Sequence, residues 1–160
     1  MSEYSENKYL RLDFPDVPPG LNGPKGLIRL HRYGLTEAKR DWFTLVMDEV
    51  PVELRNKNPQ WGSVVVIFTV KTSQRMDRDN IAAAFKFIGD ALVRQGLLLD
   101  DNATVVKIFH PKWEYVEHRA ERGCTVEIFI LDESRERIEQ EFEKWLAENL
   151  AQKQAATVTL

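Results

Sequence analysis

The chain has 160 residues, enough for one compact domain and short for two, since domains most often hold about 100–150 residues. Its 43% hydrophobic and 29% charged residues exclude a disordered or fibrous chain. The net charge of −3 argues against a protein that is basic throughout, as many nucleic-acid binders are. The excess acid lies in residues 132–160, which hold four basic and seven acidic side chains, so a basic patch elsewhere is compatible with the total.

The first half of the chain predicts two strands and a helix. Tyr9–Phe14 alternates apolar and polar residues, as a half-buried strand does, and the proline- and glycine-rich Pro15–Gly26 is expected to be a loop. Thr36 is a candidate N-cap for a helix that Pro51 ends. The β-branched run within Trp61–Thr72 indicates a central strand that is buried on both faces.

The second half begins with the clearest helix. From about Asn80 to Gln95 apolar residues recur at helical spacing, and Gly96 follows in the usual stop position. Val105–Tyr115 and Cys124–Leu131 are predicted to be strands that form a hairpin. A last amphipathic helix is expected from about residue 133 to residue 150.

This order of elements predicts an α+β fold, with helices packed on a mixed or antiparallel sheet of about four strands. We expect one domain over residues 1–150 and a frayed tail over residues 151–160. The single cysteine, Cys124, excludes an internal disulfide and a thiolate zinc cluster. No apolar run is long enough to span a bilayer, so we expect a cytoplasmic protein without a membrane partner.

Four carboxylates suggest a metal site. Asp77 and Asp79 stand two residues apart just after the buried strand, where extended chain would point both side chains the same way. Asp100 or Asp101 could add a third hard oxygen ligand, a set that suits magnesium. A simpler interpretation is also open, in which Asp79 caps the helix and the Asp100–Asp101 pair is a polar turn. Neither a helix nor a turn in the predicted arrangement requires Asp77.

Several blocks of this region together resemble the RusA-type Holliday junction resolvases, over about a fifth of the chain. The blocks are Arg75-Met76-Asp77-Arg78-Asp79-Asn80, Asp90-Ala91-Leu92, Gly96, Leu99-Asp100-Asp101 and Val105-Val106. The resemblance implies a small bacterial or phage-encoded endonuclease that acts as a homodimer. It also implies binding to a four-way DNA junction and symmetrical cutting of two strands with Mg²⁺, for which Mn²⁺ could substitute.

Carried over to this chain, the resemblance places the metal-binding acids at Asp77, Asp79 and Asp101, with Asp100 as a supporting neighbour. The family's functional lysine would stand at residue 83, where this chain has Ala83. Lys86 keeps the family spacing to Asp90, as a three-residue insertion after Asn80 would explain. Lys86 is therefore expected to offset charge at the phosphate, and the proline-rich loop at Pro18–Asn22 also resembles the family's opening.

The leading hypothesis is a magnesium-dependent endodeoxyribonuclease that resolves branched DNA in recombination and repair. Its catalytic residues would be Asp77, Asp79, Asp101 and Lys86, and phosphates would be positioned by a basic set: Lys25, Arg29, Arg32, Lys39, Arg40, Lys71, Arg75 and Arg78. One alternative is a catalytically inactive module that binds junctions or other DNA. Another is an interaction protein that uses the acidic C-terminal helix.

Overall fold

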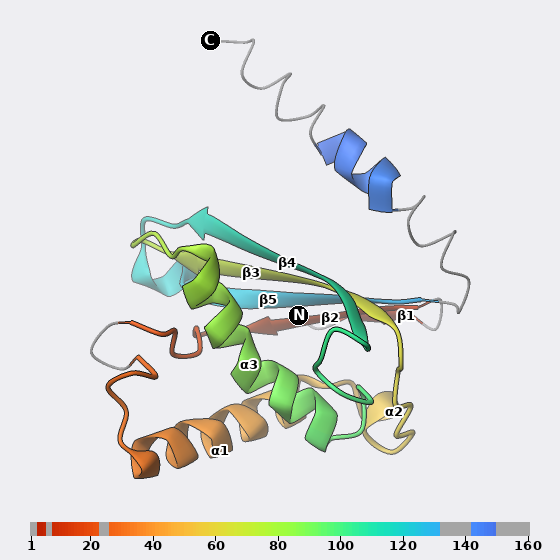
Figure 1. Ribbon diagram of the computed structural model, residues 1–160, viewed down its shortest axis with the longest axis horizontal. Coiled ribbons are helices and arrows are strands. Elements are labelled where there is room, and N and C mark those ends of the chain that lie inside the picture. The colour runs from red at the N-terminus through yellow and green to blue at the C-terminus, as the bar shows by residue number, and fades with distance from the viewer. Residues whose placement is uncertain (1–2, 6–7, 23–25, 132–141, 150–160) are drawn as a thin grey trace. The chain divides into compact units, whose positions relative to one another are not determined.

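The computed structural model describes residues 3–5, 8–22, 26–131 and 142–149 (Figure 1). By its internal contacts the chain divides into two compact units, Met1–Ile130 and Leu131–Leu160. The first unit holds every strand that the structure describes and all of the candidate site residues. The fold below is that of the first unit.

A five-stranded sheet forms one layer of this unit, in the order β1-β2-β5-β3-β4. Its strands are β1 (Glu3–Ser5), β2 (Tyr9–Phe14), β3 (Val64–Thr72), β4 (Val106–Tyr115) and β5 (Gly123–Ile130). Neighbouring strands are antiparallel except β3 and β4, which are parallel. The sheet is therefore mixed, with four long strands and the three-residue β1, and the predicted α+β class is confirmed.

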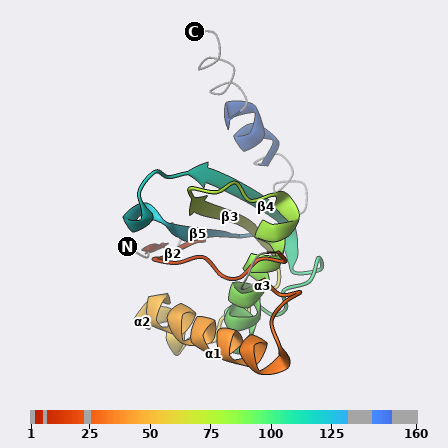
Figure 2. The same cartoon turned by 90° about the vertical axis from the view of Figure 1, so that its left-hand side faces the viewer.

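Two long helices form the second layer, on one face of the sheet (Figure 2). They are α1 (Arg32–Glu49) and α3 (Arg78–Arg94), and the short helices are α2 (Val52–Arg55) and η1 (Arg119–Glu121). The core lies between the layers. It is built from the inward side of β3, above all the fully buried Phe68, and from the apolar face of α3, where the ring of Phe85 lies 5.5 Å from that of Phe68.

The sequence patterns located β2, β3 and α3 well. β2 spans the predicted residues Tyr9–Phe14, and β3 is buried along nearly its whole length, as its β-branched run indicated. Helix α3 ends at Arg94, and Gly96 follows with a φ of 75°, a left-handed conformation that glycine adopts without strain. The end of β3 and the start of α3 are joined by residues 73–77 and therefore lie close together.

The predicted hairpin between the last two strands is wrong. β4 and β5 have nearly the predicted bounds, but β3 lies between them and pairs with both. A strand that is apolar on both faces is best buried in the middle of a sheet, and α3 supplies the crossover that a parallel β3–β4 pair requires. The segment after β4, which contains η1, therefore passes across the end of β3 rather than forming a tight turn.

The start of the first helix also differs from the prediction. α1 begins at Arg32, four residues before Thr36, with His31 at the N-cap position and no capping side chain. The Thr36 hydroxyl instead donates a hydrogen bond to the Arg32 carbonyl oxygen one turn back, at 3.0 Å. The helix ends at Glu49, before Pro51, as expected.

In the second unit the structure describes Leu131 and residues 142–149, and the latter are helical. The rings of Phe142 and Trp145 stack there, with their centroids 6.0 Å apart. The remainder of the predicted last helix and the predicted tail at 151–160 lie outside the described residues, so the domain limit at residue 150 stays a prediction. None of the described helices is long and apolar enough to cross a bilayer.

Candidate functional site

The first candidate group lies at the N-terminus of α3 and consists of Asp77, Asp79 and Asn80, here called the Asp77 group. Asp77 is the N-cap of the helix: its Oδ1 accepts hydrogen bonds from the backbone N and the side-chain Nδ2 of Asn80, both at 2.9 Å. Asp79 stands in the first helical turn, where a negative charge interacts favourably with the helix dipole.

This placement corrects two expectations. The helix cap is Asp77 and not Asp79, so the helix does require Asp77. The two carboxylates also do not follow one another in extended chain, because α3 begins at Arg78, between them. The argument that extended backbone points both side chains the same way therefore does not apply here.

Asn80 joins the start of α3 to the proline-rich loop after β2. Its Oδ1 accepts a hydrogen bond from the backbone N of Asn22, at 3.1 Å, while its Nδ2 donates to Asp77. The loop lies so close that a Cβ at Gly20 would stand 3.0 Å from the same oxygen. One amide side chain thus holds the loop against the Asp77 group.

The cap predicts a measurable loss of stability in Asp77→Ala. Removal of the carboxylate leaves the Asn80 backbone N–H without its acceptor, which should lower the free energy of unfolding by about 1 kcal/mol. Asp77→Ser keeps an acceptor oxygen and should lose much less. Urea unfolding of the three proteins checks this, and equal midpoints for wild type and Asp77→Ala would show that the cap contributes nothing.

The second candidate group lies further along α3 and consists of Lys86, Asp90 and Asp101, here called the Lys86 cluster. The Lys86 Nζ lies 3.0 Å from Asp101 Oδ2 and 3.5 Å from Asp90 Oδ1. The other Asp90 oxygen, Oδ2, lies 3.4 Å from Lys39 Nζ on α1. The cluster therefore connects α1, α3 and the loop that follows α3.

Close packing at Gly89 brings Asp101 to the helix. Gly89 is buried in α3, and a Cβ there would lie 3.4 Å from the Asp101 Cβ and 3.6 Å from its Oδ2. A larger side chain at this position would push the Asp101 loop outward. The Asp101 backbone N donates in turn to Asp100 Oδ1, at 2.7 Å, so Asp100 supports the conformation of its neighbour.

The charges of the Lys86 cluster shift the pKa values of its members. Partial burial alone would raise the pKa of Asp101, but the hydrogen bond and charge of Lys86 outweigh it and hold that pKa below its usual value. The hydrogen bond to Asp101 raises the pKa of Lys86 in return. Both side chains are therefore charged near neutral pH.

These shifts predict a pH-dependent contribution to stability. The lowered pKa of Asp101 stabilises the fold above the unfolded value of about 3.9, and this contribution is lost as the pH falls through the folded value. Because Lys86 is 62% exposed, Lys86→Met should cost only about 0.5 kcal/mol near neutral pH. In urea unfolding the difference between the wild type and Lys86→Met should narrow as the pH falls below the unfolded pKa of Asp101 and Asp101 takes up a proton. An unchanged difference there would contradict the pairing.

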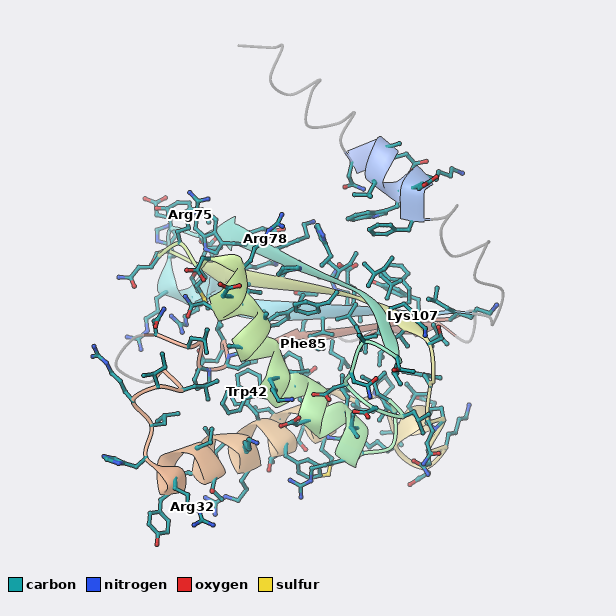
Figure 3. The ribbon with its side chains drawn as sticks, viewed as in Figure 1. Arg32, Trp42, Arg75, Arg78, Phe85 and Lys107 are labelled. Carbon is teal, nitrogen blue, oxygen red and sulfur yellow. The ribbon has the colours of Figure 1, made fainter. Side chains whose placement is uncertain are left out.

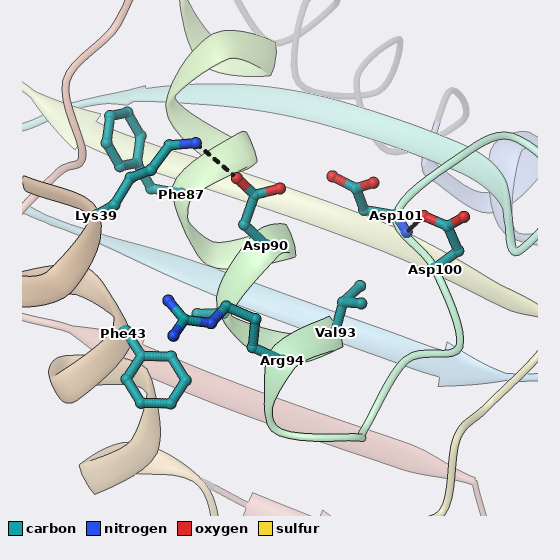
Figure 4. Close-up of a pocket in the computed structure, with 9 residues that line it drawn as sticks. Lys39, Phe43, Phe87, Asp90, Val93, Arg94, Asp100 and Asp101 are labelled. Carbon is teal, nitrogen blue, oxygen red and sulfur yellow. Dashed lines mark hydrogen bonds and ion pairs between the residues drawn. The ribbon is translucent and has the colours of Figure 1, made fainter. Parts of the chain in front are cut away.

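A shallow pocket of about 330 Å³ lies beside the Lys86 cluster (Figure 4). Asp90, Asp100 and Asp101 line it together with apolar residues and the cations of α1 and α3. On its far side the Arg94 guanidinium lies 4.6 Å from the centre of the Phe43 ring. The pocket is thus lined by charges of both signs and by apolar side chains.

The two groups do not meet. Asp79 and Gly89 are separated by about 15 Å along the axis of α3, and Asp101 lies against Gly89. Within the described part of the chain, no three His, Cys, Asp or Glu side chains are placed to hold one metal ion. In this arrangement Asp77, Asp79 and Asp101 do not fit a single three-carboxylate magnesium site, and their role as one ligand set stays a prediction.

The basic residues expected to contact DNA fall into two surroundings. Arg29 and Arg32, at the start of α1, and Arg75 and Arg78, at the start of α3, are exposed. Figure 3 shows Arg32, Arg75 and Arg78 on the side of the unit where both helices begin. Arg75 and Arg78 therefore present charge next to the Asp77 group, whereas Arg32 lies apart from them at the start of α1 (Figure 3).

The other predicted basic residues are paired with carboxylates, half-buried, or outside the described residues. Lys39 pairs with Asp90, and Arg40 lies 3.9 Å from Glu37 and 4.0 Å from Asp41. Lys71 is half-buried near the end of β3. Lys25 lies outside the described residues.

Two contributors to the site were not predicted from sequence. Asp90 was noted only within a motif, although its spacing of four residues from Lys86 is the spacing of an ion pair on a helix. Gly89, which admits the Asp101 loop, carries no comparable signal because a glycine within a helix pattern has several explanations.

Comparisons with known proteins add no relative: no family model matches the chain, and no curated protein sequence matches it significantly.

Proposed function

We propose that this protein is a magnesium-dependent endodeoxyribonuclease that cuts branched DNA, such as a four-way junction, in recombination or repair. The proposal rests on the resemblance of its acidic blocks to the RusA-type resolvases. It places the protein in the cytoplasm of a bacterial cell, or of one infected by a phage that encodes it.

The observation that carries the proposal is the contact between Lys86 and Asp101. Lys86 stands four residues before the Asp90-Ala91-Leu92 block, and Asp101 ends the Leu99-Asp100-Asp101 block, yet the Lys86 Nζ lies 3.0 Å from Asp101 Oδ2 and 3.5 Å from Asp90 Oδ1. If the Asp100–Asp101 pair were only a polar turn and Lys86 only a surface residue of the helix, nothing would require the two side chains to be in contact. This contact supports the interpretation that the blocks containing Asp90 and Asp101 serve one site.

In the proposed function the chain's own residues bind and orient the DNA. The exposed arginines at the starts of α1 and α3 neutralise backbone phosphates without reading base sequence. The Lys86 ammonium, whose raised pKa keeps it charged, would face the charge that develops on a phosphate during hydrolysis. Magnesium is expected as the cofactor on the strength of the resemblance alone.

Two copies of the chain are expected to act together. A four-way junction presents two equivalent strands for cutting, and a homodimer with two-fold symmetry would place one site on each. Sedimentation of the free protein and of its complex with a junction tests this expectation. A single protomer on each cleaved junction would contradict it.

A binding titration separates the proposal from its two rivals. Junction and linear duplex of the same length are titrated in chelator at about 50 mM and about 200 mM salt. The proposal predicts preferred junction binding that weakens with salt, followed by cleavage when magnesium is added. An inactive binding module gives the same binding and no cleavage, whereas an interaction protein built on its acidic C-terminal helix gives no salt-dependent binding to either DNA.

A further inference from the structure

An exposed apolar pair stands at the start of α1. Ile28 is 74% exposed and Tyr33 is 88% exposed, more than any other large apolar side chain in the described ranges. Arg29 and Arg32 lie between them and are exposed as well. These four residues are here called the Tyr33 arm.

Hydrogen bonds link the first residue of the Tyr33 arm to the proline-rich loop, and that loop to Asn80 of the Asp77 group. The backbone N of Leu27 donates to the Gly20 carbonyl oxygen at 2.8 Å, and that of Ile28 donates to Leu21 at 3.3 Å. The same loop, through Asn22, donates to Asn80 beside Asp77. The arm is therefore held at a set position relative to the start of α3, although its side chains point into solvent.

We propose that the Tyr33 arm is the element that selects branched over continuous DNA, with Tyr33 stacking on a base that is unstacked at the branch point. This inference rests on the proposed function. Bases in a continuous duplex are stacked on both faces, whereas a branch point offers an open face on which an aromatic ring can stack. Arg29 and Arg32 would hold the phosphates on either side, so the charge and the ring suit the same ligand.

The arrangement favours DNA over an anionic membrane. Two apolar side chains, one before the helix and one at its start, do not form the continuous apolar face that an interfacial helix needs. The test accordingly includes a measurement of binding to vesicles of phosphatidylserine and phosphatidylcholine.

The test compares Tyr33→Ala with Tyr33→Phe in the full chain. In chelator, Tyr33→Ala should lose about 10-fold or more in affinity for a four-way junction and little for linear duplex. Tyr33→Phe keeps the ring and should retain junction affinity. Tyr115→Ala removes another exposed aromatic, 63% exposed on β4, and serves as the matched control. Because the Tyr33 side chain is so exposed, its replacement should leave the far-ultraviolet circular dichroism spectrum of the protein unchanged.

The outcomes separate this inference from the proposed function. If the wild type prefers the junction and cleaves it but Tyr33→Ala loses nothing, or loses junction and duplex binding equally, only the Tyr33 arm is overturned. If the wild type prefers the junction, and this preference depends on Tyr33, but it never cleaves the junction, the proposed nuclease function is overturned and the proposed role of the Tyr33 arm is supported. No preference for the junction, or Tyr33-dependent binding to the vesicles instead, overturns the arm.

Discussion

Asp101→Asn should reduce junction cleavage by about 100-fold or more while leaving junction binding unchanged or stronger. The substitution keeps the size of the side chain and removes the charge that Lys86 faces at 3.0 Å. It also removes repulsion between a carboxylate and the DNA phosphates, so affinity should not fall. Cleavage is measured on a labelled junction under single-turnover conditions, and binding is measured separately in chelator.

The matched control for this change is Asp48→Asn. Asp48 is exposed on α1 and belongs to neither candidate group, yet its substitution alters the net charge by the same amount. It should cleave as the wild type does. Full cleavage activity in Asp101→Asn would show that the Lys86 cluster is not part of the proposed active site. An equal loss of cleavage in Asp48→Asn would show that the effect comes from the net charge alone.

Phe68→Ala should lower the free energy of unfolding by about 3–5 kcal/mol, a large part of the stability of a domain of this size. Phe68 is fully buried in the central strand β3 and packs against Phe85 of α3. Truncation removes apolar contacts and leaves a cavity between the sheet and the helix that carries both candidate groups. Urea unfolding with circular dichroism detection measures the loss.

The control for this second prediction is Phe68→Leu, which retains much of the buried volume and should cost distinctly less. A surface change such as Val52→Ala, at a residue 65% exposed on α2, should have little effect. A loss below about 1 kcal/mol in Phe68→Ala would mean that the two layers do not pack tightly around this ring.

The local sequence pattern alone could predict those elements whose burial follows directly from their own residues. The apolar run of β3 can only be buried on both faces, and the helical spacing of α3 ends at a glycine that adopts a positive φ. The place of β4 was not predictable in this way, since its residues are half-buried and give no sign of which strand they adjoin. Pairing with β3 rather than β5 is decided by the crossover through α3.

The candidate site was predicted in its residues but not in its geometry. Asp77 and Asp79 are both good helix caps, and a difference of two residues in where α3 begins decides which of them takes the role. Whether Asp101 reaches the helix depends on the path of a loop and on the space at Gly89. The separation of the Asp77 group from the Lys86 cluster follows from the length of α3 between them.

The most direct test of the proposed function is incubation of the full chain with an end-labelled four-way junction and magnesium, beside a linear duplex of the same sequence. The account predicts paired nicks at symmetrical positions on two strands of the junction, none on the duplex, and none in chelator. An uncut junction, or equal cutting of junction and duplex, would contradict it.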